Sequence, residues 1–202
     1  PDATPLGDLR ELLDVVVRNT DRLRALVEQL LDLAALESGH AGATTVPVDL
    51  TSVVAEAVVA VRPAAEARHI TVHTDLSRQV SMTGDRDRLR QVVDHLLDNA
   101  VKYSPDKTTV TVSLTGSDDV AELTVTDTGT SVPADEYAQL TRRLYRGSNA
   151  RHNGIPGLGL GLAISRAIVD RHHGTLTIAV GQPSGTTATV RLPCTDRRLC
   201  PG

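Results

Sequence analysis

The chain has 202 residues, a formal net charge of -4 and 40% hydrophobic residues, which is enough for one sizeable domain with an appendage and too apolar for a disordered or fibrous protein. It contains three tyrosines but no phenylalanine or tryptophan, so any core must be built from Leu, Val, Ile and Ala. The pI near 6.0 and the scarcity of aromatic side chains argue against nucleic-acid binding, which needs a basic face and stacking platforms.

No apolar run approaches the roughly 20 residues that span a bilayer, and the N-terminus has neither a basic region nor an apolar signal segment. We therefore expect no membrane contact by this part of the protein. The two cysteines, Cys194 and Cys200, both lie in the short polar tail 194–202, which argues against a disulfide framework and a four-ligand zinc site. A cytoplasmic location fits these features, and a membrane anchor upstream in the parent protein is compatible with them.

Residues 9–33 predict one long helix that ends before Gly39. Apolar side chains recur along it in alternating steps of three and four, interrupted only by Asn19: Leu9, Leu12, Val16, Leu23, Leu26, Leu30 and Leu33. Further apolar residues flank this stripe and make it wide. A wide stripe favours a helix that packs against a second chain, so we expect a homodimer, although a helix lying on its own domain stays an alternative.

Short strands alternate with helices in the rest of the chain. In order, we predict a strand at 47–50, a helix at 51–67 interrupted near Pro63, strands at 70–76 and 79–84, a helix at 85–103, strands at 109–114 and 121–126, a helix at 160–173, and a hairpin with strands at 175–180 and 186–192. This mixture of antiparallel strands and helices indicates the α+β class and a two-layer α/β sandwich.

The helix predicted at 85–103 has a polar face with side chains spaced three and four residues apart: His95, Asn99, Lys102 and Tyr103. An amide oxygen, an ammonium group and a phenol on one edge suit a metal-nucleotide, because they offer an oxygen ligand, a positive charge and a ring. Taken alone, such a face is more often simply solvated.

Two glycine-containing segments support the nucleotide interpretation. Asp127 and Gly129 follow directly on a strand, where a buried carboxylate can accept a hydrogen bond and glycine admits a flat ring, although Asp-x-Gly is also a common turn. Residues 154–162 run into a helix, whose free amides favour a polyphosphate. The third glycine of a dinucleotide fingerprint would fall at Leu162, and no G-K-[ST] of a P-loop is present.

Basic residues precede the second glycine segment and predict a lid over phosphates, or else a basic loop that only aids solubility. They are Arg142, Arg143, Arg146, Arg151 and His152.

Taken in order, the runs RLRQVVDHLLDNAVKYSP, VTDTG, YRGSNARHNGIPGLGLGLAISRAIVDRHHGTLTI and SGTTATVRLP resemble the N box, glycine boxes and lid of the catalytic, ATP-binding domain of sensor histidine kinases. RNTDRLRALVEQLLDLAALESG resembles the second helix of that family's dimerisation and phosphoacceptor domain. The resemblance implies a GHKL, or Bergerat-type, fold. It divides the chain into a dimerisation helix at 1–40, a catalytic ATP-binding domain at 41–193 and the polar tail at 194–202.

The resemblance also implies residue roles. Asn99 matches the residue that holds Mg²⁺, Lys102 and Tyr103 match residues that reach phosphate and nucleoside, and Asp127 matches the carboxylate that selects adenine. The catalytic candidates it implies are Asn99, Lys102 and His95. The ATP-binding candidates are Asn99, Lys102, Tyr103, Asp127, Gly129, Arg146, Gly157, Leu158, Gly159, Leu160, Gly161 and Thr186.

The implied activity is transfer of the γ-phosphoryl group from ATP to a histidine, with Mg²⁺ as cofactor and a response regulator as a further partner. None of the chain's histidines lies in the family's phosphoacceptor box, so we expect the acceptor on a helix that this chain does not contain. An ATP hydrolase of the gyrase and chaperone type is less favoured, because His95 stands where those enzymes place a glutamate base.

The chain departs from the family's pattern at several positions. Ser131 replaces a glycine of the first glycine box, and Thr141, Leu144 and Ala188 stand where phenylalanines are usual. If position 131 requires a positive φ, Ser131 costs about 1 kcal/mol and loosens the adenine side of the pocket. These departures leave a second hypothesis open, a degenerate, non-catalytic dimerisation or regulatory module with weak or no nucleotide binding.

Overall fold

The structure is a computed structural model that describes residues 6–38, 45–76, 79–117, 119–129, 131–148, 150, 155, 157–181 and 184–194. Its helices are α1 (Leu6–Glu37), α2 (Leu50–Glu66), α3 (Arg86–Tyr103) and α5 (Gly161–Arg171), with a 3-10 turn η1 (Tyr137–Gln139). Its strands are β1 (Val46–Asp49), β2 (Thr71–Asp75), β3 (Ser81–Gly84), β4 (Thr109–Gly116), β5 (Val120–Asp127), β6 (Thr175–Val180) and β7 (Thr186–Pro193). Each predicted helix and strand is thus confirmed, with ends that differ by a few residues.

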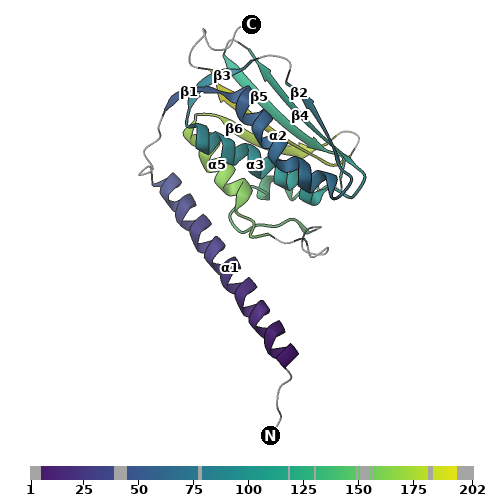
Figure 1. The fold of residues 1–202 in the computed structure, drawn as a ribbon. Helices are drawn as coiled ribbons and strands as arrows, with labels where there is room; N and C mark the ends of the chain where they lie inside the picture. Colours follow the sequence, from purple (N-terminus) through teal and green to yellow (C-terminus); the bar gives the residue numbers. More distant parts are fainter. Residues whose placement is uncertain are drawn as a thin grey trace.

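Five of the strands form one mixed sheet, in the order β2-β4-β5-β7-β6. Strand β2 pairs with β4 in parallel, and the other neighbours are antiparallel. Strands β1 and β3 form a separate antiparallel pair at the edge of the domain. Figure 1 shows α2, α3 and α5 lying side by side on one face of the large sheet. The α+β class and the two-layer sandwich are therefore confirmed.

The core lies between these helices and the sheet and is made of aliphatic side chains. The predicted apolar stripe of α3 is buried along its whole length: Leu89, Val92, Val93, Leu96, Leu97, Ala100 and Val101. Strand β5 alternates buried and half-buried residues, as expected for a strand with one covered face. The buried stripe of α3 turns the opposite, polar face of that helix away from the core.

Helix α2 runs through Pro63 without a break, so the predicted interruption is wrong. Proline removes one backbone bond, here to the carbonyl of Val59 four residues earlier. Both Val59 and Pro63 lie on the exposed face, so water can take the place of the missing amide. The buried face of α2 keeps its packing, and tertiary contact outweighs the local preference.

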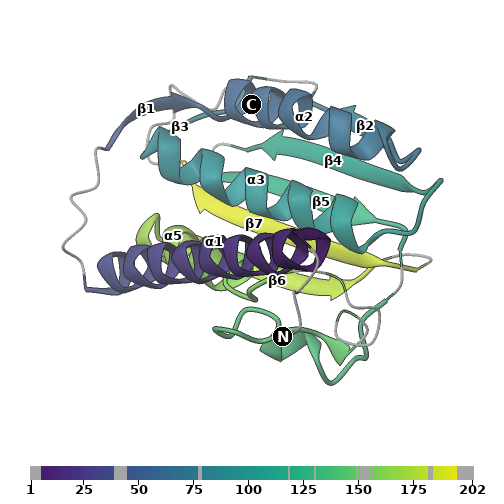
Figure 2. The same cartoon turned by 60° about the horizontal axis from the view of Figure 1, so that its bottom comes forward.

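Helix α1 lies on the helical side of the domain (Figure 2) and contacts it by its C-terminal part, from which the rest of the helix extends away (Figure 1). Leu33 and Leu36 are buried, Asp32 pairs with Arg88 of α3 at 2.6 Å, and Glu37 pairs with Arg143. Towards the N-terminus the helix extends beyond the sandwich, and several of its apolar side chains are more than half exposed: Leu12, Leu13, Val16, Val17, Leu23, Val27 and Leu31. One end of α1 thus lies on its own domain, and the rest presents the wide stripe that suggested a second chain.

Cys194 ends the described part of the chain. It is buried and its amide donates to the carbonyl of Asp119 at 2.8 Å, so it belongs to the packed domain rather than to the tail. It is also disulfide-bonded, a bond that the sequence did not lead us to expect. Residues 195–202 lie outside the described residues. Within the described part, no helix is both long enough and apolar enough to cross a membrane.

Candidate active site

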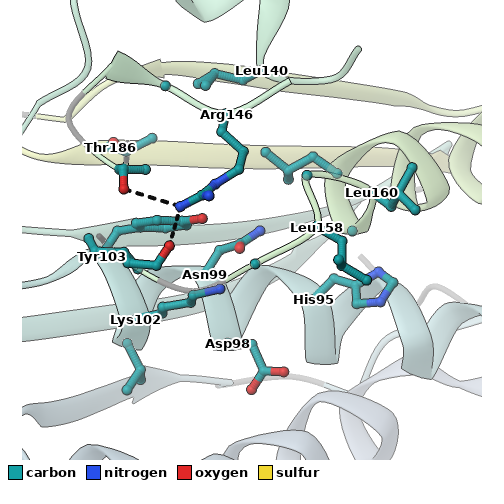
Figure 3. A pocket seen from close by; sticks show the side chains of 18 of the residues that line it. His95, Asp98, Asn99, Lys102, Tyr103, Leu140, Arg146, Leu158, Leu160 and Thr186 are labelled. Carbon is teal, nitrogen blue, oxygen red and sulfur yellow. Dashed lines mark hydrogen bonds between the residues drawn. The ribbon is translucent and has the colours of Figure 1, made fainter. Parts of the chain in front are cut away.

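A cavity of about 640 Å³ lies between α3, the start of α5 and the segment around Arg146. Figure 3 shows the labelled side chains converging on it from separate parts of the chain. Twelve of the residues singled out in the sequence line it: His95, Asn99, Lys102, Tyr103, Asp127, Arg146, Gly157, Leu158, Gly159, Leu160, Gly161 and Thr186. Gly129 does not line the cavity. Its amide donates a hydrogen bond to Asp127, which does line the cavity.

Helix α3 presents the polar side of the cavity. Asp85 caps its first turn by accepting from the amide of Arg88 at 3.1 Å, which sets where the helix begins. From that start, burial of the apolar stripe directs Asn99, Lys102 and Tyr103 towards the cavity. The Lys102 ammonium lies 5.4 Å from the centre of the Tyr103 ring.

Two effects lower the pKa of Lys102. Burial contributes most, and the neighbouring Arg146 guanidinium adds to it, while Asp98 acts in the opposite direction. Arg146 is held at the cavity by hydrogen bonds from its Nη2 to the carbonyls of Ala150, at 3.1 Å, and Ile155. In Figure 3 its guanidinium extends towards Thr186 and Tyr103. Two cations that face one cavity make its electrostatic potential suitable for an anion.

Asp127 lies at the end of β5 and is buried, with 7% of its surface exposed. Its Oδ1 accepts from the amide of Gly129 at 2.8 Å and from the amide of Thr186 at 3.3 Å. Burial raises the pKa of the Asp127 carboxyl, although these hydrogen bonds from the backbone lower it in part. Gly129 fits closely, because a Cβ added there would lie 2.9 Å from Asp127 Oδ1.

Ser131 does not have a positive φ, so the condition under which we expected it to be costly is not met. Its hydroxyl instead accepts from the amide of Gly185 at 2.9 Å and donates to the carbonyl of the same residue at 3.2 Å. The conformation that requires glycine is found at Gly185, with φ +91°, where a Cβ would lie 2.0 Å from the carbonyl oxygen of Asp127. The hydrogen bonds of the Ser131 hydroxyl therefore hold the β6–β7 turn close to the end of β5.

The glycine segment before α5 forms the opposite wall of the cavity. A Cβ at Gly157 would lie 2.6 Å from Lys102 Nζ, so this lysine reaches across the cavity to the segment. Gly159 has φ +72°, and a Cβ there would lie 2.6 Å from the carbonyl oxygen of Tyr145. Helix α5 begins at Gly161, and its N-cap residue, Leu160, makes no side-chain hydrogen bond to the first amides. These amides and the helix dipole favour an anion at this end of the cavity.

His95 connects α3 to α5. Its Nδ1 lies 3.2 Å from the hydroxyl of Ser165, which is fully buried, and its Cγ lies 3.5 Å from the position of a Cβ on Gly161. Burial lowers the pKa of His95 and outweighs the opposite influence of Asp98 and Asp94. The imidazole is therefore neutral at neutral pH, and its contacts support the start of α5.

We expect His95 to make the protein less stable in acid. Its pKa is lowered in the folded protein, whereas in the unfolded chain it is near 6.5, so the unfolded chain takes up the proton first. The stability that His95 contributes is complete above pH 6.5 and is lost as the pH falls below that value. The free energy of unfolding, measured with urea from pH 8 to pH 5, should fall more steeply in the wild type than in His95→Gln. Equal slopes would contradict this assignment.

The basic residues expected to form a lid separate into two groups. Arg146 lines the cavity, whereas Arg142 and Arg143 line a second cavity of about 570 Å³ between α1 and α5. Arg151 and His152 lie outside the described residues.

At three positions this chain has another residue where the family usually has phenylalanine. None of the three lines the cavity of about 640 Å³. Thr141 belongs to the second cavity, Leu144 is exposed with φ +58°, and Ala188 is buried in the core.

Several lining residues were missed from the sequence: Gln29, Arg68, Asp98, Val132, Leu140, Tyr145, Ile155 and Ile178. Asp98 and Tyr145 are direct neighbours of Asn99 and Arg146, so adjacency to a recognised motif could have indicated them. Ile155 lies within the glycine segment 154–162, and Gln29 and Ile178 lie in runs that resemble the family, but none of the three was singled out. The missed residues reach the cavity from distant helices, strands and loops, which periodicity and spacing do not relate to one another.

The sequence model of the histidine kinase-, DNA gyrase B-, and HSP90-like ATPase family matches residues 84–196. The sensor-like histidine kinase SenX3 of Mycobacterium bovis is 30% identical over 185 residues, which are 92% of this chain and 45% of SenX3. The signal transduction histidine-protein kinase/phosphatase MprB of Mycolicibacterium vanbaalenii is 36% identical over an alignment of 199 residues that covers 94% of this chain and 39% of MprB. The chain thus spans less than half the length of these relatives.

Solved structures agree with the sequence relatives. The mycobacterial sensor histidine kinase MprB is 34% identical with a TM-score of 0.65, over 73% of this chain and 97% of that chain. Full-length ShkA in complex with AMPPNP has a TM-score of 0.79 over 97% of this chain and 41% of that chain, and at 22% identity it shows the fold alone. Together with a family match over more than half of the chain, these likenesses show that the chain belongs to the histidine kinase-, DNA gyrase B- and HSP90-like ATPases and contains the catalytic ATP-binding domain of a sensor histidine kinase.

Proposed function

We propose that the cavity binds ATP with Mg²⁺ and that the domain transfers the γ-phosphoryl group to a histidine on a helix outside this chain. The observation that carries the proposal is the convergence of Asp127, Lys102, Asn99 and the start of α5 on one cavity of about 640 Å³. That volume suits a small-molecule ligand. Its lining combines a buried carboxylate, two cations and the first amides of α5.

Asp127 is the residue proposed to recognise adenine. The backbone amides of Gly129 and Thr186 hold its carboxylate in place, and Asp127 itself lines the cavity. A carboxylate fixed in this way can accept a hydrogen bond from the exocyclic amino group of adenine. It would not accept one from guanine, which presents a carbonyl at the corresponding position. The site therefore favours ATP over GTP.

Lys102, Arg146 and the first amides of α5 are proposed to bind the phosphates. Phosphoryl transfer depends mainly on positioning and on stabilising charge on the transferred group, and these groups supply both. The neutral His95 is engaged with Ser165 and is held close to Gly161, which suits a positioning role better than activation of water. This favours transfer to a protein acceptor over hydrolysis.

Mg²⁺ fits the residues that face the phosphate end. It prefers oxygen ligands and is commonly held by one or two protein groups together with substrate phosphates, where it neutralises charge on the phosphates. The amide oxygen of Asn99 is the proposed protein ligand, as its side chain lies at the cavity. No group of three or more His, Cys, Asp or Glu side chains suited to a metal lies within the described residues, so most ligands would come from the nucleotide.

The proposed partners follow from the sensor kinases to which the chain is similar. They are a second copy of the chain, bound through the exposed stripe of α1, and a response regulator that receives the phosphoryl group from the histidine. The proposed location is the cytoplasm. Ser131 was the departure expected to loosen the adenine side of the cavity, but its hydroxyl makes two hydrogen bonds with Gly185. This supports an active domain over a degenerate module.

The test is calorimetric titration with a non-hydrolysable ATP analogue, with and without Mg²⁺. We expect binding that strengthens at least tenfold with Mg²⁺ in the wild type, and loss of that dependence in Asn99→Ala. Arg24→Ala serves as the control, because Arg24 is fully exposed on α1, away from the cavity. Phosphoryl transfer is measured with labelled ATP and an added phosphoacceptor helix. No binding at millimolar analogue would refute the proposal and favour a non-catalytic module.

A further inference from the structure

The guanidinium of Arg68 lies at the C-terminal end of α3 and bonds to several groups there. Its Nη1 donates to the carbonyls of Val101 and Lys102 at 2.6 and 3.2 Å, and its Nη2 donates to the carbonyl of Ser104 at 2.7 Å. Its Nε donates to Asp106 Oδ1 at 3.0 Å. One side chain from the loop after α2 therefore holds the last turn of α3 and the residues that follow it.

The end of α3 needs such a partner. The last carbonyls of a helix have no bonds within the helix, and many helices solve this with a glycine in a left-handed conformation. Here Ser104 follows the helix in an extended conformation, and Pro105 comes next. A guanidinium can satisfy several carbonyls at once because its donors are fixed in a planar fork, and its charge is favourable at the negative end of the helix dipole.

The sheet brings Arg68 to this place. Strands β2 and β4 are parallel and in register, with Thr71 opposite Thr109, so the loops that precede them lie side by side. Two backbone bonds join these loops, from Thr71 N to Thr108 O at 2.9 Å and from Lys107 N to Arg68 O at 3.2 Å. The backbone of Arg68 is thereby fixed, and its side chain is only 36% exposed.

The turn that Arg68 holds carries two residues of the cavity, Lys102 and Tyr103 (Figure 3). Arg68 itself also lies in the cavity lining. We propose that Arg68 is a positioning residue for nucleotide binding, which acts by fixing the backbone of Lys102 and Tyr103. The inference rests on the proposed function. Lysine cannot replace Arg68, because a single ammonium cannot reach Val101, Lys102 and Ser104 in a fixed geometry.

The first measurement needs no nucleotide. Hydrogen exchange of the backbone amides at 101–108 is compared in the wild type, Arg68→Lys and Arg62→Lys. Arg62→Lys makes the same change on the exposed face of α2, outside the cavity lining. We expect faster exchange in Arg68→Lys only. Unchanged exchange there would overturn the role of Arg68, whatever the nucleotide result.

The second measurement is a double-mutant cycle on the affinity for the ATP analogue. Arg68→Lys should lose about tenfold in affinity, equivalent to about 1.4 kcal/mol, and the loss should shrink below about threefold when Lys102→Met is already present. Equal losses in both backgrounds would mean a general structural effect and would overturn the inference. If Arg68→Lys does not fold, Arg68→Gln, which retains an amide donor, replaces it. Absence of binding by the wild type would refute the proposed function, and the exchange data would still decide whether Arg68 holds this turn.

Discussion

Replacing Asp127 by asparagine is expected to weaken binding of the ATP analogue about 100-fold, close to 2.7 kcal/mol. The Asp127 carboxylate accepts from the amides of Gly129 and Thr186 and, in the proposed complex, from adenine. An asparagine has only one acceptor oxygen, so its amino group must face either a backbone donor or the adenine amino group. One donor is then left without an acceptor in a buried place. Calorimetry on the folded variant measures the loss.

Glu122→Gln is the matched control for this prediction. It makes the same carboxylate-to-amide change on the same strand, at a residue that pairs with Arg191 and does not line the cavity. Its affinity for the analogue should equal that of the wild type. Burial raises the pKa of the Asp127 carboxyl above the ordinary aspartate value of 3.8. As the pH is lowered, the wild-type affinity should therefore begin to fall at a higher pH than it would if the pKa of this carboxyl were unshifted. Asp127→Asn binding as tightly as the wild type would place adenine elsewhere.

Gly159→Ala is expected to reduce nucleotide affinity by at least tenfold and to lower stability. A left-handed conformation costs a residue with a Cβ roughly 1–2 kcal/mol, and Gly159 has φ +72°. The new Cβ would also lie 2.6 Å from the carbonyl oxygen of Tyr145, which is backbone and cannot rotate away. The segment must shift, and the amides at the start of α5 shift with it. Urea denaturation and calorimetry measure the two effects.

Gly161→Ala is the matched control for Gly159→Ala, because it replaces a glycine by alanine without introducing backbone strain. Gly161 is the first residue of α5 and has no positive φ, and a Cβ there would make an ordinary contact with His95 at 3.5 Å. This variant should therefore be at least as stable as the wild type, since alanine is favoured over glycine in a helix. If Gly159→Ala proved as stable as Gly161→Ala, the strain argument would be wrong.

Much of the fold could be predicted because its signals are local. The spacing of Leu89, Val92 and Leu96 indicated α3 and its buried face, and the polar turn after Leu114 separated β4 from β5. Motifs of a few residues each also indicated twelve of the residues that line the cavity. Each of these features depends on residues that lie within a few positions of one another, where periodicity and turn chemistry act.

Other features were mispredicted because a distant contact decides them. Pro63 suggested a break, but the buried face of α2 is held by packing, and the bond that proline loses faces water. Ser131 suggested strain, but its hydroxyl bonds to Gly185, 54 residues away in the chain. In both cases the local signal was correct about the residue type, and packing or a hydrogen bond with a distant element decided the outcome.

By itself, the sequence determined the helices and strands, the two-layer class and the set of residues available for a nucleotide, since these depend on patterning and composition. Only the tertiary structure decided which of those residues face one cavity and what holds them there. It brought Arg68 to the end of α3 through the parallel pairing of β2 with β4, and it separated Arg146 from Arg142 and Arg143. Strand register and helix docking join residues far apart in the chain, and no periodicity within one segment contains that information.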